Sequence, residues 1–199
     1  MKLGHYRMFF VVVGLIGILL IASPLIGLLL HLPPGEPFSE LYLLGSGHMA
    51  ENYPFNVLPG ENYLIYLDVG NHVGVSAYYV VYVKLQNESD LLSNTITEKP
   101  SPVEPLYEYR FFIENNQTLE RPMTFSILDA TFSPNQSIIR SVEINNVTFN
   151  VNKPAEWDVD TSLYHYRLLF ELWKFNPQSG NISYDNRFVV LQLNLTKTS

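Results

Sequence analysis

Few residues in this sequence have the types and spacing that catalysis needs. The Gly-Ser-Gly run at residues 45–47 lacks the third glycine and the helix of a phosphate-binding loop, and no Gly-x-Ser-x-Gly motif occurs. His48 with Glu51, or His72 with Asp68, would supply two metal ligands, but no third ligand follows at a fixed spacing. The sequence has no cysteine, which excludes thiolate metal sites and disulfides. We therefore expect no catalytic residue, no cofactor and no enzymatic activity.

One group of carboxylates allows two interpretations. Glu156, Asp158 and Asp160 alternate, so an extended backbone would place all three on one side. Carboxylate oxygens are the ligands that calcium prefers, which makes a calcium site one interpretation. A solvated acidic loop is the simpler interpretation, and we favour it.

Tyrosines are frequent between residues 42 and 82. A row of exposed tyrosines would suit sugar binding, whereas aromatic side chains on strands more often fill or cover a sandwich core. We favour the second interpretation. The tyrosines concerned are Tyr42, Tyr53, Tyr63, Tyr66, Tyr78, Tyr79 and Tyr82.

Six Asn-x-Ser/Thr motifs, the acceptors for N-linked glycans, occur between residues 87 and 196. Asn, Ser and Thr are common in turns, which is the alternative explanation of these motifs. Their number nevertheless favours an external surface that carries glycans. The acceptors are Asn87, Asn116, Asn135, Asn146, Asn181 and Asn194.

Residues 8–30 form an apolar run without a charged side chain. As a helix, these 23 residues would extend roughly 34 Å, slightly more than the ~30 Å hydrocarbon core of a bilayer. A cleaved signal peptide has a shorter apolar region that ends at a small-x-small site, which is missing here. We therefore predict a retained transmembrane helix that places the chain in a lipid bilayer.

The charges beside this run predict its orientation. Lys2 and Arg7 precede it, so the positive-inside rule places residues 1–7 in the cytoplasm. Residues 31–37 are rich in proline and predict an extended linker. Residues 38–199 then form one extracytoplasmic domain of a single-pass cell-membrane protein.

The charge of the outer part limits its partners. Ten of the twelve Lys and Arg follow the membrane segment, against all nineteen Asp and Glu, which gives a net charge of −9. Nucleic-acid binding requires clustered basic residues, so we exclude nucleic acid as a partner. The same charge disfavours docking on anionic lipid headgroups.

The outer part has the pattern of an all-β protein. Residues 63–69 and 75–85 are rich in Tyr and Val, and Met123, Phe125 and Ile127 alternate with polar residues. Residues 162–174 also fit a helical period, but the turn-forming residues 176–180 favour a hairpin and thus a strand. We predict an immunoglobulin-like β-sandwich of eight or nine strands, with a loop over residues 89–103.

Several short motifs resemble the family called domain of unknown function 1616, predicted membrane proteins found mainly in archaea. The resemblance covers most of residues 38–196. Its segments are FSELYLLG (38–45), AENYP (50–54), PGE (59–61), VGNH (69–72), ENNQTLE (114–120), LLFELWK (168–174) and RFVVLQLNLT (187–196).

The resemblance implies an immunoglobulin-like domain on a membrane anchor, and no reaction. It implies a turn at Pro59 and Gly60, and a strand end at residues 70–72, where Asn71 tolerates the unusual backbone angles that a strand end can need. Two features depart from the family pattern. Members often carry several N-terminal membrane helices, whereas this chain has one, and residues 128–165 form a longer connection.

The sequence leaves two functions open. The first is a non-enzymatic surface protein that binds a protein partner at the cell envelope or serves as an accessory subunit of a membrane complex. The second is a carbohydrate-binding or carbohydrate-processing module. Exposed tyrosines over a groove would favour sugar, and an exposed apolar patch would favour a protein partner.

Overall fold

The computed structural model describes residues 3–29 and 36–197 and divides into two compact units, Met1–Pro37 and Phe38–Ser199. The first unit contains helix α1 (Leu3–Leu29). Side chains of α1 are described for residues 6–20, and no helix within the described residues is both long and apolar enough to cross a membrane. Most of the predicted linker, residues 31–35, lies outside the described residues.

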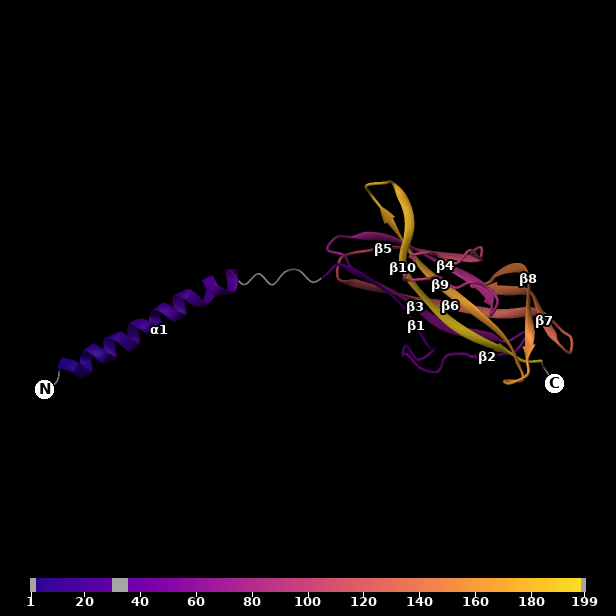
Figure 1. Cartoon of the computed structure of the whole chain (residues 1–199), viewed down its shortest axis with the longest axis horizontal. Helices are drawn as coiled ribbons and strands as arrows, with labels where there is room; N and C mark the ends of the chain where they lie inside the picture. Colours follow the sequence, from indigo (N-terminus) through magenta and orange to yellow (C-terminus); the bar gives the residue numbers. More distant parts are fainter. Residues whose placement is uncertain (1–2, 30–35, 198–199) are drawn as a thin grey trace. The chain divides into compact units, whose positions relative to one another are not determined.

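The second unit is all-β, and its ten strands form two layers (Figure 1). The first sheet contains, in spatial order, β1 (Phe38–Leu44), β3 (Asn62–His72), β6 (Gln117–Phe132), β7 (Gln136–Ile144) and β8 (Val147–Asp158). The second sheet contains β2 (Asn56–Val57), β10 (Asn181–Leu195), β9 (Leu163–Asn176), β4 (Ala77–Asn87) and β5 (Tyr107–Ile113). All pairings are antiparallel except that of β2 with β10.

One strand joins the two sheets. Most of β8 pairs with β7, but its last residues, Trp157 and Asp158, pair with Tyr164 and Leu163 of β9. The hydrogen-bonded sheet is therefore continuous and curls over the core. Figure 1 shows β7 and β8 at the end of the domain near the C-terminus.

The core lies between the sheets and follows the alternation of the strands. The predicted alternation on β6 is confirmed, because Met123, Phe125 and Ile127 are buried whereas Thr124 is exposed. Full burial of each such side chain contributes about 1.5–3 kcal/mol. The largest fully buried side chains are Tyr79, Tyr166, Phe170, Ile65, Leu67, Ile113, Met123, Ile127, Ile139, Ile144, Leu169 and Leu172.

The strand predicted over residues 162–174 is confirmed as β9, and its apparent helical period has a structural cause. Leu168 and Phe170 point into the core, as alternation requires. Leu169 and Glu171 point to the opposite face, yet they too are fully buried. A strand that is buried on both faces carries apolar residues without strict alternation, which imitates the pattern of a buried helix.

A buried ion pair fastens residues 88–106, which include the predicted loop, to the outer face of the second sheet. Glu171 on β9 lies 2.8 Å from Lys84 Nζ on β4, and neither side chain is more than 5% exposed. The other oxygen of Glu171 accepts hydrogen bonds of 2.6 Å from the hydroxyl of Ser93 and the backbone N–H of Ser101. Trp173 Nε1 also donates to this carboxylate, at 3.2 Å. Glu171 thus joins two strands to the loop.

Two details near β3 test the resemblance-based expectations. Gly60 has φ +84°, so the expected turn at Pro59 and Gly60 is confirmed. The expected strand end at residues 70–72 is confirmed, because β3 ends at His72. Asn71 does not adopt the unusual backbone angles that its residue type tolerates. Its backbone is that of a strand, and its buried amide donates to the carbonyls of Val75 and Ile113 and accepts from the hydroxyl of Tyr79.

We predict that Glu171→Ala lowers the free energy of unfolding of the full-length protein by about 3–5 kcal/mol, because Lys84 would remain buried without its partner. Urea unfolding in detergent, followed by circular dichroism, measures this change. Lys174→Ala is the matched control. It removes the more exposed pair of Lys174 with Asp185, and we expect a loss below about 1 kcal/mol. Equal losses in both variants would contradict the prediction.

Candidate functional site

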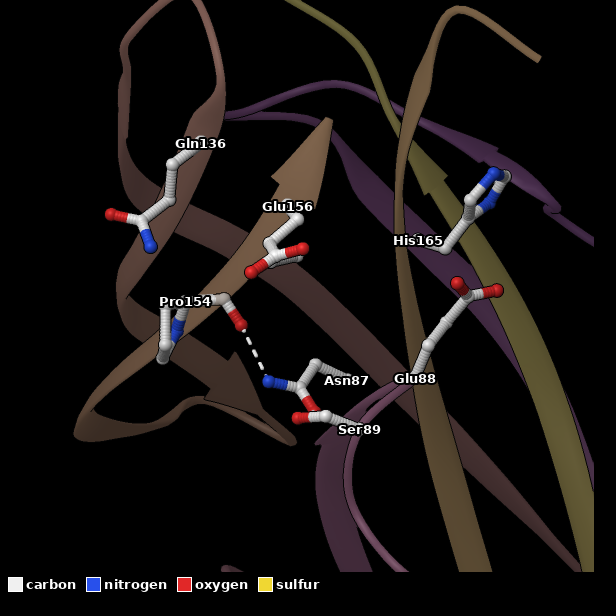
Figure 2. Close-up of a pocket in the computed structure, with 8 residues that line it drawn as sticks. Asn87, Glu88, Ser89, Gln136, Pro154, Glu156 and His165 are labelled. Atoms are coloured by element: carbon white, nitrogen blue, oxygen red, sulfur yellow. Dashed lines mark hydrogen bonds between the residues drawn. The ribbon is translucent and has the colours of Figure 1, made fainter. Parts of the chain in front are cut away.

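A polar pocket of about 430 Å³ lies between the end of β4 and strands β7, β8 and β9 (Figure 2). Asn87 Nδ2 donates to the carbonyl of Pro154 at 2.8 Å across its floor. The carboxylates of Glu88 and Glu156 come from different elements. The lining residues are Asn87, Glu88, Ser89, Gln136, Pro154, Ala155, Glu156 and His165.

The imidazole at this pocket already has partners on both nitrogens. His165 Nε2 lies 2.7 Å from Thr161 Oγ1 and 3.1 Å from Asp158 Oδ2, and its Nδ1 lies 3.1 Å from Asn194 Oδ1. A general base needs a nitrogen that can reach a substrate proton. His165 therefore holds the start of β9 to its neighbours, and both of its ring nitrogens are engaged.

The structure separates the three carboxylates that the sequence places on one side. Glu156 lines the pocket, whereas Asp158 closes the turn before β9. Asp158 accepts hydrogen bonds from Thr161 Oγ1 at 2.8 Å and from the backbone N–H of Asp160 at 2.9 Å. The bond from Thr161 contributes most to holding the pKa of Asp158 below its usual value. Among the described residues, no three His, Asp or Glu side chains are grouped as metal ligands.

A second polar region lies on the outer face of the first sheet, where β1, β3 and β6 are neighbours. Tyr42, Asp68 and Glu120 stand opposite one another in the strand register. Glu40 belongs to the adjacent row of the register, and His48 reaches this surface from the loop after β1. We call these five residues the acidic face.

Two glycines shape the acidic face. A side chain at Gly45 would collide with the backbone carbonyl of Glu51, so glycine is needed for the tight loop that carries His48. A Cβ at Gly70 would lie 2.6 Å from Glu40 Oε2, so glycine leaves the space that the Glu40 side chain occupies. Both glycines belong to segments that carry the family resemblance.

His48 covers the face by stacking and by hydrogen bonding. Its ring lies 3.9 Å from the ring of Tyr66, and its Nδ1 lies 2.8 Å from Glu120 Oε1. His48 has φ 57°, a left-handed conformation that costs a non-glycine residue energy. The contacts with Tyr66 and Glu120 offset this cost and fix the imidazole beside the carboxylates.

Asp68 is the buried centre of the acidic face. Its side chain is 4% exposed, and its Oδ2 has no hydrogen-bond partner. Burial raises the pKa of Asp68 to about 6; the charge of Glu120 adds to the rise and His48 opposes it. Burial, and then the charges of Asp68, Glu40 and Glu120, also raise the pKa of Tyr42. The strand register places Tyr42 directly opposite Asp68.

The metal-ligand pairs that the sequence suggests do not form. His48 pairs with Glu120 instead of Glu51, and His72 lies 3.6 Å from Glu40 and stacks on Phe38. The role of Glu120 was missed because register, not sequence spacing, brings β3 and β6 together. The resemblance segments were the available signal, since four of them, at residues 38–45, 50–54, 69–72 and 114–120, surround this surface.

The seven tyrosines of the sequence analysis do not form one exposed row that could bind a sugar. Among the seven named above, Tyr79 is fully buried, Tyr42 is 37% exposed, and the others are half-buried. Tyr79 bonds inside the core to Ser39 and Asn71, and Tyr53 donates to the carbonyl of Leu43 at 2.7 Å. The interpretation that these aromatic residues mainly fill and cover the sandwich fits this distribution.

An apolar hollow of about 640 Å³ lies on the second sheet, at the end where β4 begins and β9 ends. Phe112 is 67% exposed and Phe175 is 38% exposed, so two large aromatic side chains face solvent together. The lining residues, which we call the apolar hollow, are Tyr78, Phe112, Phe175, Gly180, Asn181 and Ile182.

The six glycan acceptors fall into two groups. Asn87 donates its amide to Pro154, and Asn194 donates its amide to Asn56 Oδ1 at 3.1 Å, so both amide nitrogens are engaged. Both of these side chains are half-buried. The other four are exposed and lie in turns or at a strand start. They are Asn116, Asn135, Asn146 and Asn181.

Residues 32–136, slightly more than half of the chain, match the family described as a domain of unknown function, DUF1616. The chain belongs to the DUF1616 family. The matched range contains the first six strands and every residue of the acidic face. The resemblance segments at residues 168–174 and 187–196 lie beyond it. No curated protein sequence matches the chain.

Solved structures are similar to this DUF1616 protein at low identity. A β-glucosidase from Listeria innocua in complex with laminaribiose is 9% identical, with a TM-score of 0.43 over 80% of this chain and 16% of the enzyme. The CARDB domain of a Pyrococcus furiosus protein in complex with di-metal ions is 10% identical, with a TM-score of 0.37 over 81% of this chain and 90% of that domain. The chain thus spans a small part of the β-glucosidase.

We predict that Asp68→Asn removes a pH dependence from the stability of the protein. The folded state retains the Asp68 proton up to about pH 6, whereas the unfolded chain loses it near pH 4, so native stability falls as the pH rises through this window. The amide of the variant does not titrate. We expect equal thermal midpoints at pH 4 and a variant more stable by about 1–3 kcal/mol at pH 7.5.

Thermal unfolding from pH 4 to pH 7.5, followed by circular dichroism, measures this difference. Glu143→Gln is the matched control, since Glu143 lies on β7 of the same sheet and outside the acidic face. A pH profile of Asp68→Asn that runs parallel to that of the unchanged protein would contradict the assignment.

Proposed function

We propose that this protein is a membrane-anchored β-sandwich that binds a protein partner outside the cytoplasm, at the cell envelope or within a membrane complex. The anchor is proposed from the uncharged run at residues 8–30, and the orientation from Lys2 and Arg7. The exposure of Phe112 and Phe175 in the apolar hollow carries the proposal of a protein partner.

The apolar hollow has the chemistry of a protein-binding surface. Clustered apolar side chains on a soluble surface mark interaction sites more often than scattered ones do. Aromatic residues supply much of the binding energy when a partner covers them, because they bury a large area with few rotatable bonds. Phe112 and Phe175 provide two such rings, and Tyr78 and Ile182 are half-buried beside them.

We also propose an immunoglobulin-like relationship for the sandwich. The first sheet contains the order β1-β3-β6, and the second contains β5-β4-β9-β10. These orders correspond to strands A-B-E and C′-C-F-G of immunoglobulin-type domains. In this assignment the hairpin of β7 and β8 is an insertion between strands E and F, within the long connection at residues 128–165.

The carbohydrate alternative has less support. Only Tyr42 among the seven tyrosines named above is exposed, and it lies beside carboxylates instead of other exposed rings. The polar pocket in Figure 2 has no Tyr, Phe or Trp in its lining. Binding through a surface requires no catalytic residue, so we propose a non-enzymatic role.

The exposed glycan acceptors provide a test of the external location. We predict glycans on Asn116, Asn135 and Asn146 of protein purified from its own membranes, and unmodified Asn87 and Asn194, whose amides are engaged. Asn181 lines the apolar hollow, so we expect it to be unmodified where a partner covers that surface. Mass spectrometry of proteolytic peptides measures the occupancy of each site. A glycan on Asn87 or Asn194 would contradict the accessibility argument, and six unmodified sites would contradict glycosylation.

The partner is tested by site-directed photo-crosslinking of the full-length protein in its native membrane. We predict that a photoreactive residue at position 112 forms a discrete adduct and that Phe175→Ser reduces this adduct at least about fivefold, because the two rings form one surface. Position 147 is the matched control, since Val147 is 46% exposed on β8. Equal adducts at both positions, or no adduct at either, would contradict the proposal.

A further inference from the structure

The carboxylates of the acidic face have no Lys or Arg partner at the neighbouring outward positions of the first sheet. Outward positions alternate along β1, β3 and β6, and the register places Glu40, Asp68 and Glu120 on them. No Lys or Arg occupies an outward position of residues 38–44, 66–72 or 118–122. His48 and His72 are the only basic side chains at this described surface.

The nearest arginine in sequence does not neutralise these carboxylates. Arg121 follows Glu120, but its Nη1 donates to the backbone carbonyl of Glu120, at 3.1 Å, and not to a carboxylate. His48 satisfies one oxygen of Glu120. Asp68 Oδ2 remains buried without a donor, although an ionised carboxylate can accept several hydrogen bonds.

We propose that the acidic face binds the guanidinium group of an arginine side chain presented by a partner protein. The guanidinium lies between Asp68 and Glu120, against the ring of Tyr42. It donates hydrogen bonds to the carboxylates of Asp68 and Glu120. This site is separate from the apolar hollow and does not depend on the function proposed for it.

The spacing of the two carboxylates suits a planar donor group. Asp68 and Glu120 face each other on adjacent antiparallel strands, where Cβ atoms lie about 4.5–5.5 Å apart. A guanidinium group presents five N–H donors in a rigid plane, so it can bridge two carboxylates, whereas an ammonium group is a point charge. Tyr42 completes the row on the other side of Asp68 and is 37% exposed, so its ring is available for stacking with the cation.

A metal ion fits the face less well. The described residues contain no group of three His, Asp or Glu arranged as metal ligands, so a metal would require the carboxylates to move. A guanidinium group is larger and can bridge carboxylates that stand on neighbouring strands. The two glycines preserve this arrangement, since Gly45 holds the His48 loop and Gly70 leaves the space for Glu40.

The acidic face lies within the part of the chain that defines its family. Residues 40–120, which contain all five side chains, fall inside the matched range 32–136. The polar pocket and the apolar hollow both draw residues from beyond position 136. The acidic face is therefore the surface that we expect other DUF1616 proteins to share.

The test titrates the full-length protein in lipid nanodiscs with N-acetyl-arginine amide, at pH 7.5 and low salt, by ligand-observed NMR. N-acetyl-citrulline amide is the matched probe, because it has nearly the same shape without the charge. We expect saturable binding of the arginine probe and at least tenfold weaker binding of the citrulline probe. Asp68→Asn and Glu120→Gln should each weaken arginine binding about tenfold.

Glu143→Gln is the control variant and should leave the dissociation constant unchanged. Thermal unfolding of every variant establishes that it is folded. Equal binding of the two probes would overturn the proposal, as would unchanged arginine binding in folded Asp68→Asn and Glu120→Gln proteins. Position 112 lies on the other sheet, so Phe112→Ser should leave arginine binding unchanged. A negative result in this titration would therefore count against the acidic face alone and not against the apolar hollow.

Discussion

The carboxylate of Glu171 is the interaction on which most of the second sheet depends. It lies in the middle of β9, where a strand of a two-layer sandwich would normally face water. Its bonds to Lys84, Ser93 and Ser101 hold residues 88–106 over the outer face of β4 and β9. A buried charge is costly unless it is paired and hydrogen-bonded, and here both oxygens have partners.

The position of residues 88–106 determines which surfaces of the second sheet remain available to a partner. Val80 and Leu169 are fully buried on this outer side, whereas Phe175 near the end of β9 is 38% exposed. The apolar hollow is therefore an exposed part of the same face. The first sheet is different, because carboxylates around Asp68 line its outer face and the loop that carries His48 covers part of them. The two sides of the domain thus offer different chemistry to a partner.

The local features of the fold could be predicted from the sequence, and the long-range ones could not. Alternation identifies β6 through Met123, Phe125 and Ile127, and the turn at Gly60 follows from residue type. The strand β9 was harder, because burial on both faces removes the alternation. The residue type of Asn71 indicated only that it tolerates unusual backbone angles. Its actual role, as a buried amide that bonds to Val75, Ile113 and Tyr79, depends on contacts between distant segments.

The candidate site shows the same limit more sharply. His72 and Asp68 are close in sequence, yet they occupy different rows of the sheet and do not pair. Asp68 and Glu120 are 52 positions apart and stand directly opposite each other. No spacing rule connects them, because the register of β3 against β6 is set by the whole core between the sheets. The glycines at positions 45 and 70 were visible as motif residues, but their steric purpose requires the positions of Glu51 and Glu40.

The antiparallel order also gives the domain a mechanical property. β1 begins at one end of the sandwich, beside His72, and β10 finishes at the opposite end, beside Tyr164. A pull between these two points acts along the strands. It loads the hydrogen bonds of β1 with β3, and of β10 with β9, in shear, so many bonds must break together. A domain connected in this way resists extension. It transmits tension between the start of β1 and the end of β10.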